Sequence, residues 1–245
     1  GYVSASSFIG DGSQITGIVT DPFPYTGSAD ITGSIDLVGP ITTGDGTNTV
    51  GTNGNEAAVG GRSNAVTGNV AGAFGGEAHT VSGFRAGAFG GEQSTVTGTN
   101  SFVMGGYDNR ATSAYDGVVG GTSNQTNGAK SVIAGGESNN VVNGDLHFIG
   151  GGGNTQITGN ARWSGVIAGF GNILSGGQMS FIGGGRLNQT SGASQAFIGG
   201  GESHLVSATK GAIVGGNNNT VASGHTNSVI LGGTNISSTA ADTAY

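Results

Sequence analysis

The sequence contains no cysteine, little charge and little proline, and each shortage excludes a class of protein. Without cysteine, no disulfide framework can form among its 245 residues. Charged residues make up 9% of the chain, which argues against an acidic disordered linker because such linkers are highly charged. The three prolines are too few for a collagen-like chain, which also needs glycine at every third position.

Positive charge and long apolar runs are scarce as well. Seven Lys and Arg against 14 Asp and Glu give a net charge of −7. We therefore expect no nucleic-acid partner, because affinity for nucleic acid comes mainly from neutralised phosphates. No stretch approaches the roughly 18 consecutive apolar residues of a membrane-spanning helix, so we also expect no direct membrane insertion.

Glycine, in contrast, accounts for 54 residues. It costs about 1 kcal/mol per helical position relative to alanine, which disfavours a helical protein. Many of the glycines are periodic: a Gly-Gly pair preceded by apolar residues recurs every 15 residues from Gly60 to Gly150. The pattern then continues less regularly, after a first interval of 19 residues, at Gly169, Gly183, Gly199, Gly215 and Gly232.

Each repeat holds two short apolar segments separated by glycine and asparagine, which favour turns. Two strands of about 4–6 residues and their turns fill such a repeat. Stacking the repeats lets each strand pair with the strands above and below it, which satisfies the backbone. We therefore predict an all-β fold, a parallel β-solenoid (β-roll) of about 12 rungs over residues 56–237 with a repeat of about 15 residues.

The two apolar segments of a repeat differ in pattern. The second has one apolar residue between polar ones, as in Asn64–Thr67, so that one of its faces is buried. The first has adjacent apolar residues, as in Phe148–Ile149 and Phe181–Ile182, which point to opposite faces of a strand. A rung buries only one face within its own chain. We therefore predict an obligate oligomer, with Gly-Gly pairs that let backbones approach closely; a further domain over that face is the alternative.

Three segments resemble the head repeats of YadA-type trimeric autotransporter adhesins: SVIAGGESNNVVNG (Ser131–Gly144), SFIGGGRLNQTSG (Ser180–Gly192) and GAIVGGNNNTVASG (Gly211–Gly224). The resemblance implies a left-handed β-roll, a homotrimer around one axis, and an adhesive role outside the cell on a bacterial surface fibre. Residues 1–55 resemble the connector, shaft or cap modules of phage tail fibres, and residues 238–245 resemble a junction to a following module. A virion tail fibre is therefore the other expected carrier.

No catalytic, cofactor-binding or metal-binding motif is expected. Asparagine tolerates left-handed backbone and forms hydrogen bonds to neighbouring backbone groups. It recurs at one position of the repeat. His79 and His204 take the same position and are expected to be turn residues. We predict a structural ladder of turn asparagines formed by Asn64, Asn109, Asn124, Asn139, Asn172, Asn188 and Asn219.

Charged residues follow several of the Gly-Gly pairs. Arg62 precedes Glu77 by one repeat, and Arg186 precedes Glu202 by one repeat. Residues one repeat apart are cross-strand neighbours in a solenoid. We therefore predict two ion pairs at these positions.

The segment that closes each rung varies most and contains the only tryptophan. Loops on one side of a solenoid often carry binding residues, and Trp163 beside Arg162 is suited to stack on a sugar ring. We therefore predict receptor contacts by Phe84, Arg85, Tyr115, Asp116, Lys130, His147, Arg162 and Trp163.

Three functions remain open at this point. The first is an adhesive segment of a trimeric fibre that binds a glycan or protein receptor on a cell surface. The second is a structural spacer with recognition elsewhere. The third is a depolymerase of surface polysaccharide, which needs paired carboxylates in a groove; clustering of Asp116, Glu137 and Asp145 from different chains would favour it.

Overall fold

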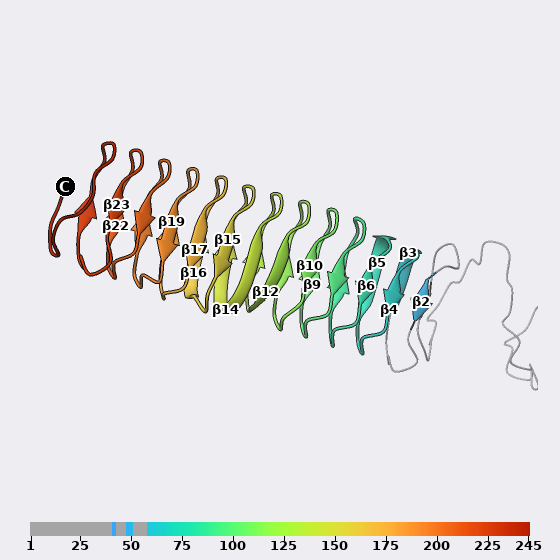
Figure 1. Ribbon diagram of the computed structural model, residues 1–245. Coiled ribbons are helices and arrows are strands. Elements are labelled where there is room, and N and C mark those ends of the chain that lie inside the picture. Colours follow the sequence, from blue (N-terminus) through green and yellow to red (C-terminus); the bar gives the residue numbers. More distant parts are fainter. Residues whose placement is uncertain (1–40, 43–47, 51–57) are drawn as a thin grey trace, which may run out of the picture. The chain divides into compact units, whose positions relative to one another are not determined.

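The computed structural model describes residues 41–42, 48–50 and 58–245, all within the compact unit Leu37–Tyr245. Every regular element in this part of the chain is a β-strand, and the strands stack in rows (Figure 1). Strands one rung apart pair in parallel, as β6 (Thr80–Val81) does with β8 (Thr95–Val96). The predicted all-β parallel solenoid of about 12 turns is thereby confirmed.

No helix among the described residues is long and apolar enough to cross a membrane.

Each rung contributes one strand to each of two parallel rows, here called series A and series B. The long strand β14 (Asn140–Ile149) belongs to both, because its first half pairs with β12 and β15 and its second half pairs with β13 and β16. Series A further contains β1 (Ile41–Thr42), β3 (Ala58–Arg62), β5 (Gly72–Glu77), β7 (Gly87–Ala88), β9 (Phe102–Val103), β11 (Gly117–Val118), β13 (Val132–Ile133), β16 (Arg162–Val166), β18 (Phe181–Ile182), β20 (Phe197–Ile198), β22 (Ala212–Ile213) and β24 (Val229–Ile230).

Series B lies on the other side of the rung and contains the remaining strands. Its members alternate with those of series A along the chain. They are β2 (Thr49–Val50), β4 (Ala65–Val66), β6, β8, β10 (Arg110–Ala111), β12 (Gln125–Ala129), β15 (Gln156–Thr158), β17 (Ile173–Ser175), β19 (Gln189–Ser191), β21 (Leu205–Val206) and β23 (Thr220–Val221).

A third row of parallel pairings runs beside these two. It consists of single-residue bridges, such as Glu77 to Glu92 and Glu92 to Tyr107, and continues to Asn217 and Thr234. Sequence patterning identified only the two charged pairs of this row, because one paired residue per rung leaves no apolar alternation.

The hydrophobic core is a double file of side chains, one from each series. Series A contributes one fully buried residue per rung, such as Ile133 or Ile182, and series B contributes one, such as Val141 or Leu174. Ala111, Thr126 and Thr190 take this position in three rungs of series B. This double file is thin, and stacking of rungs rather than thickness of the core supplies the buried apolar area.

The strand register corrects the intervals counted from Gly-Gly pairs. Ile133 pairs with Ile149, Ile149 with Val166, and Val166 with Ile182, so these rungs contain 16, 17 and 16 residues rather than 15, 19 and 14. Gly169 takes the same position as Gly152 in the preceding rung. A Cβ added to Gly152 would lie 2.1 Å from the carbonyl oxygen of Gly169. The pairs at positions 150 and 169 therefore belong to different positions of the repeat.

The pairing extends past both predicted limits of the solenoid. At one end, Ile41 pairs with Ala58 and Thr49 pairs with Ala65, ahead of residue 56. At the other end, Val229 forms a bridge with Ala244, beyond residue 237. The rest of the predicted 1–55 module lies outside the described residues.

Candidate functional site

The outer face of series A exposes large apolar side chains along the whole described solenoid. Phe74 is 58% exposed and Leu231 is 65% exposed, near opposite ends of the row. Soluble monomers seldom expose one continuous apolar stripe of this length. The stripe consists of Phe74, Phe89, Phe102, Met104, Val119, Val132, Phe148, Ile167, Phe181, Phe197, Val214 and Leu231.

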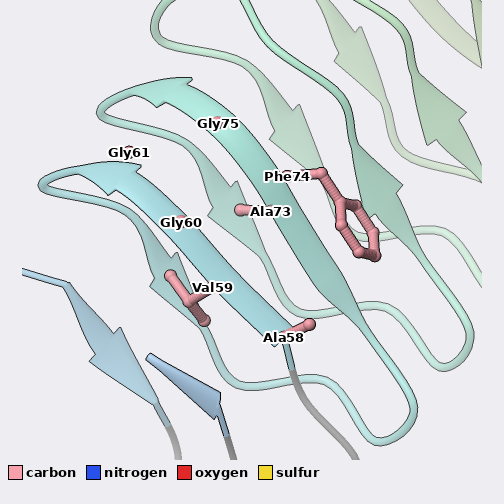
Figure 2. A pocket seen from close by; sticks show the side chains of 7 residues that line it. All are labelled: Ala58, Val59, Gly60, Gly61, Ala73, Phe74 and Gly75. Atoms are coloured by element: carbon pink, nitrogen blue, oxygen red, sulfur yellow. The ribbon is translucent and has the colours of Figure 1, made fainter. Parts of the chain in front are cut away.

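In most rungs, a large side chain of the apolar stripe lies beside a glycine on the same strand. A Cβ added to Gly72 would lie 2.5 Å from the ring of Phe74, and one added to Gly87 would lie 2.8 Å from the ring of Phe89. Figure 2 shows Phe74 pointing to one side of β5 while Ala73 points to the other, into the rung. The rings of Phe74 and Phe89 stack with centroids 5.1 Å apart, so neighbouring rungs form a continuous apolar surface.

Next to the apolar stripe runs a column of glycines with open space around it. Nine of its ten glycines would place a Cβ more than 4 Å from any atom beyond the adjacent residues, and only Gly75 and Gly90 have a left-handed φ. Within one chain, neither packing nor backbone conformation requires glycine at the other positions. The column consists of Gly75, Gly90, Gly105, Gly120, Gly135, Gly151, Gly184, Gly200, Gly215 and Gly232, with Ala168 in the remaining rung.

The glycine that follows in each pair has a different role. Gly136 has a φ of 91°, and its Cβ would lie 2.1 Å from the carbonyl oxygen of Gly152. Here the contact between rungs of the same chain excludes any side chain. The close approach predicted for Gly-Gly pairs therefore divides into one position used inside the chain and one that faces outward.

The predicted asparagines lie inside the rung, where series B begins. Asn124 Nδ2 donates to the carbonyl oxygens of Gly120 and Gly136, and Asn124 Oδ1 accepts from the backbone N–H of Asn139. Each side chain thus closes its own turn and holds the next rung. All seven are buried: Asn64, Asn109, Asn124, Asn139, Asn172, Asn188 and Asn219.

Histidine replaces asparagine in two rungs of this ladder. Nδ1 of His79 accepts the backbone N–H of Ser94, and Nδ1 of His204 accepts that of Asn219. The imidazole therefore supplies the acceptor that an Asn Oδ1 supplies elsewhere. Burial lowers the pKa of both histidines, because the charged form loses its hydration inside the rung.

A second buried polar column lies where series A begins, and it contains two predicted receptor contacts. Asp116 accepts hydrogen bonds from the backbone N–H groups of Ser113 and Ser131, and it is fully buried. Burial raises its pKa to about 6. His147 is 3% exposed, and burial lowers its pKa. Asp116 and His147 therefore cannot contact a receptor, and that prediction was wrong for these two residues.

The sequence did contain a signal for this burial. Asp116 and His147 each stand two residues before the inward residue of a series A strand, and residues two apart face the same side. Small residues fill the same position in the other rungs. They include Ala71, Ala86, Ser101, Ser131, Ser164, Ser180, Ala196 and Ser228.

The other six predicted contacts are exposed and lie on one edge. This edge, here called the A corner, is the bend that leads into the inward residue of each series A strand, and in β14 and β16 it lies within the strand itself. Phe84, Tyr115 and Trp163 are 39%, 56% and 51% exposed, and Arg162 lies 5.0 Å over the ring of Trp163. Three exposed apolar residues of the same corner were missed, because they are neither aromatic nor charged: Val70, Leu146 and Met179. The six predicted residues are Phe84, Arg85, Tyr115, Lys130, Arg162 and Trp163.

The two predicted ion pairs are present. Arg62 bonds Glu77 and Arg186 bonds Glu202, and all four side chains are substantially exposed. Exposed pairs of this kind contribute at most about 1 kcal/mol each. Both ion pairs lie on the third row of pairings. Their small contribution to stability does not explain why the rungs stack.

The described residues contain no group of three or more His, Asp or Glu side chains placed to hold a metal ion. Burial of Asp116 also removes one of the three carboxylates that would have favoured a depolymerase. Hollows in the surface lie near the start of the solenoid; one of about 400 Å³ is lined by residues that include Ala58, Phe74 and Gly75 (Figure 2). It is lined by glycine backbone and apolar side chains, without an acid, base or nucleophile.

The sequence matches no protein-family model and no curated protein.

Proposed function

We propose that this chain is a segment of an extracellular fibre, a homotrimeric, left-handed β-roll that attaches to the surface of a cell. The observation that carries the proposal is the apolar stripe with its open glycine column. Burying such a stripe against a partner is favourable by about 25 cal/mol for each Å² removed from water. Glycines with free space around them let a second backbone come close.

Copies of the same chain are the partner that fits this face best. The stripe and the glycine column repeat once per rung, so an identical, parallel chain presents its own stripe at the same spacing. A rotation axis parallel to the solenoid brings equivalent rungs together and gives a closed assembly. Three copies, rather than two, follow from the resemblance of the repeats to YadA-type adhesins.

The adhesive part of the proposal rests on the A corner. It carries exposed aromatic and basic side chains on an edge that series A and series B leave uncovered. Three chains would present three copies of each contact, and multivalent attachment gains through effective concentration even when each contact is weak. A bacterial surface fibre and a virion tail fibre are the two carriers that such a segment suits.

Two measurements test the proposal on the full chain. Light scattering after gel filtration should give three times the chain mass of 23.7 kDa. The fluorescently labelled protein should then bind to intact bacterial or animal cells in a saturable manner. A monomer would overturn the assembly, and a trimer that binds no cell would favour the structural spacer.

A further inference from the structure

Hydrogen bonds between rungs fix the backbone of the A corner, and with it the direction in which each outward side chain leaves the chain. The N–H of Met179 donates to the carbonyl of Arg162 one rung earlier, at 2.8 Å, and the N–H of Lys130 donates to that of Ala114, at 2.9 Å. The corner residue has left-handed backbone, with φ of 63° at Tyr115 and 51° at Trp163. Side chains on this edge are therefore preorganised by the solenoid.

Left-handed backbone is uncommon for bulky residues and is retained where the surrounding structure determines it. The equivalent turn before each series B strand, here called the B corner, has nearly always a small or polar residue, such as Ser123 or Asn154; Leu187 is the bulky exception. The A corner instead places bulky residues in three successive rungs: Leu146, Trp163 and Met179.

A polar residue directly precedes each of these three bulky residues in the sequence. Arg162 donates to Asp145 Oδ2 at 3.2 Å and lies over the indole of Trp163. Gln178, in the following rung, pairs with Arg162 through a parallel backbone β-bridge. A carboxylate, a guanidinium and an amide thus lie along three rungs spaced about 4.8 Å apart, beside an indole that stays half-exposed.

We propose that this ridge, formed by Asp145, Leu146, Arg162, Trp163, Gln178 and Met179, binds an uncharged glycan. The inference deepens the proposed adhesive function and rests on it. The C–H face of a pyranose ring packs on an exposed indole. The sugar hydroxyls, which both donate and accept, match the carboxylate, guanidinium and amide beside it.

The charges favour an uncharged glycan over an acidic one. Asp145 neutralises Arg162 locally, and the chain carries a net charge of −7, so an anionic saccharide would meet no free positive charge at Trp163 itself. A protein receptor would need a far larger contact, of about 800 Å² on each partner. The ridge presents one indole edged by polar groups, which suits a sugar better.

The experiment measures binding of the full chain to immobilised neutral oligosaccharides, with sialylated and sulfated ones as the anionic arm. Trp163→Ala should weaken binding to the neutral glycans at least about tenfold, and Trp163→Phe should restore part of it. The matched control is Leu187→Ala, which removes an equally exposed bulky residue from the B corner. Thermal unfolding and the oligomer mass must stay unchanged in all variants.

Cell binding separates the outcomes. Periodate oxidation of cell-surface glycans should abolish attachment, while protease treatment should leave it. Protease-sensitive, periodate-resistant attachment would overturn the glycan in favour of a protein receptor. Attachment that persists in Trp163→Ala would remove the ridge from the site and leave the adhesive function standing, whereas no attachment by the wild type would contradict the adhesive function itself. Loss of the oligomer in Trp163→Ala would assign the ridge to an interface between copies.

Discussion

Asn124 Oδ1 accepts a hydrogen bond from the backbone N–H of Asn139, one rung further along, at 3.0 Å. The same amide donates to carbonyl oxygens of two rungs, so one side chain bonds to three backbone groups, of which the N–H of Asn139 is buried. Because an unsatisfied buried group costs about 1–3 kcal/mol, Asn124→Ala should lower the free energy of unfolding by about 2 kcal/mol. Chemical denaturation measures this. Thr122→Ala, at an exposed position nearby, should change it little.

Replacing the ladder histidines should make the protein more tolerant of acid. Because burial lowers the pKa of His79 and His204, the unfolded chain takes up protons first as pH falls below about 6.5, and stability is lost there. His79→Asn and His204→Asn restore the ladder residue and remove this proton uptake. Both variants should lose less melting temperature than the wild type between pH 7.5 and pH 5. An unchanged acid loss in the double variant would contradict the assignment, and His225→Asn, outside the column, serves as control.

Asp116 should have the opposite pH dependence. Its pKa is raised from 3.8 to about 6, so the folded state binds a proton more readily than the unfolded state, and stability falls as pH rises from about 4 to about 6. Asp116→Ser, which installs the residue found at Ser101 and Ser131, removes this titration. The stability difference, variant minus wild type, should therefore grow by up to about 3 kcal/mol over this range. Denaturation curves at pH 4, 5, 6 and 7 measure it, and a flat difference would show that Asp116 titrates normally.

Two adjacent glycines should respond differently to the same substitution. Gly135→Val adds a side chain into open space without a left-handed φ, whereas Gly136→Val places a Cβ 2.1 Å from the carbonyl of Gly152. Gly136→Val should prevent folding of its rungs. Gly135→Val should keep the β-sheet signal in circular dichroism but weaken association, as measured by light scattering across protein concentrations. A fully associated Gly135→Val protein would contradict the role of the glycine column.

Periodicity was enough to predict the solenoid, its two strand series and the asparagine position, because each is a residue type repeated at a constant spacing. It failed where one residue type serves several positions. Glycine occupies the open column, the left-handed position after it and the place beside Phe74, so the pair at Gly169 was aligned with the wrong column. It also failed at Asp116, where a charged residue suggested exposure although its spacing from Val118 places it inside.

The ladders of the solenoid also bear on how its length can change. Asn109, Asn124 and Asn139 each bond to the next residue of the column in the same way. If one complete repeat is removed, the two rungs that become neighbours can form the same hydrogen bonds. An added repeat can form them with both of its neighbours. The rod can be shortened or extended in steps of one rung, about 4.8 Å, while the stripe, the glycine column and the A corner stay on their own sides. The length of the solenoid can thus change independently of the chemistry of its surfaces. Duplication of a repeat in the gene lengthens the solenoid and leaves the residue types on each side unchanged.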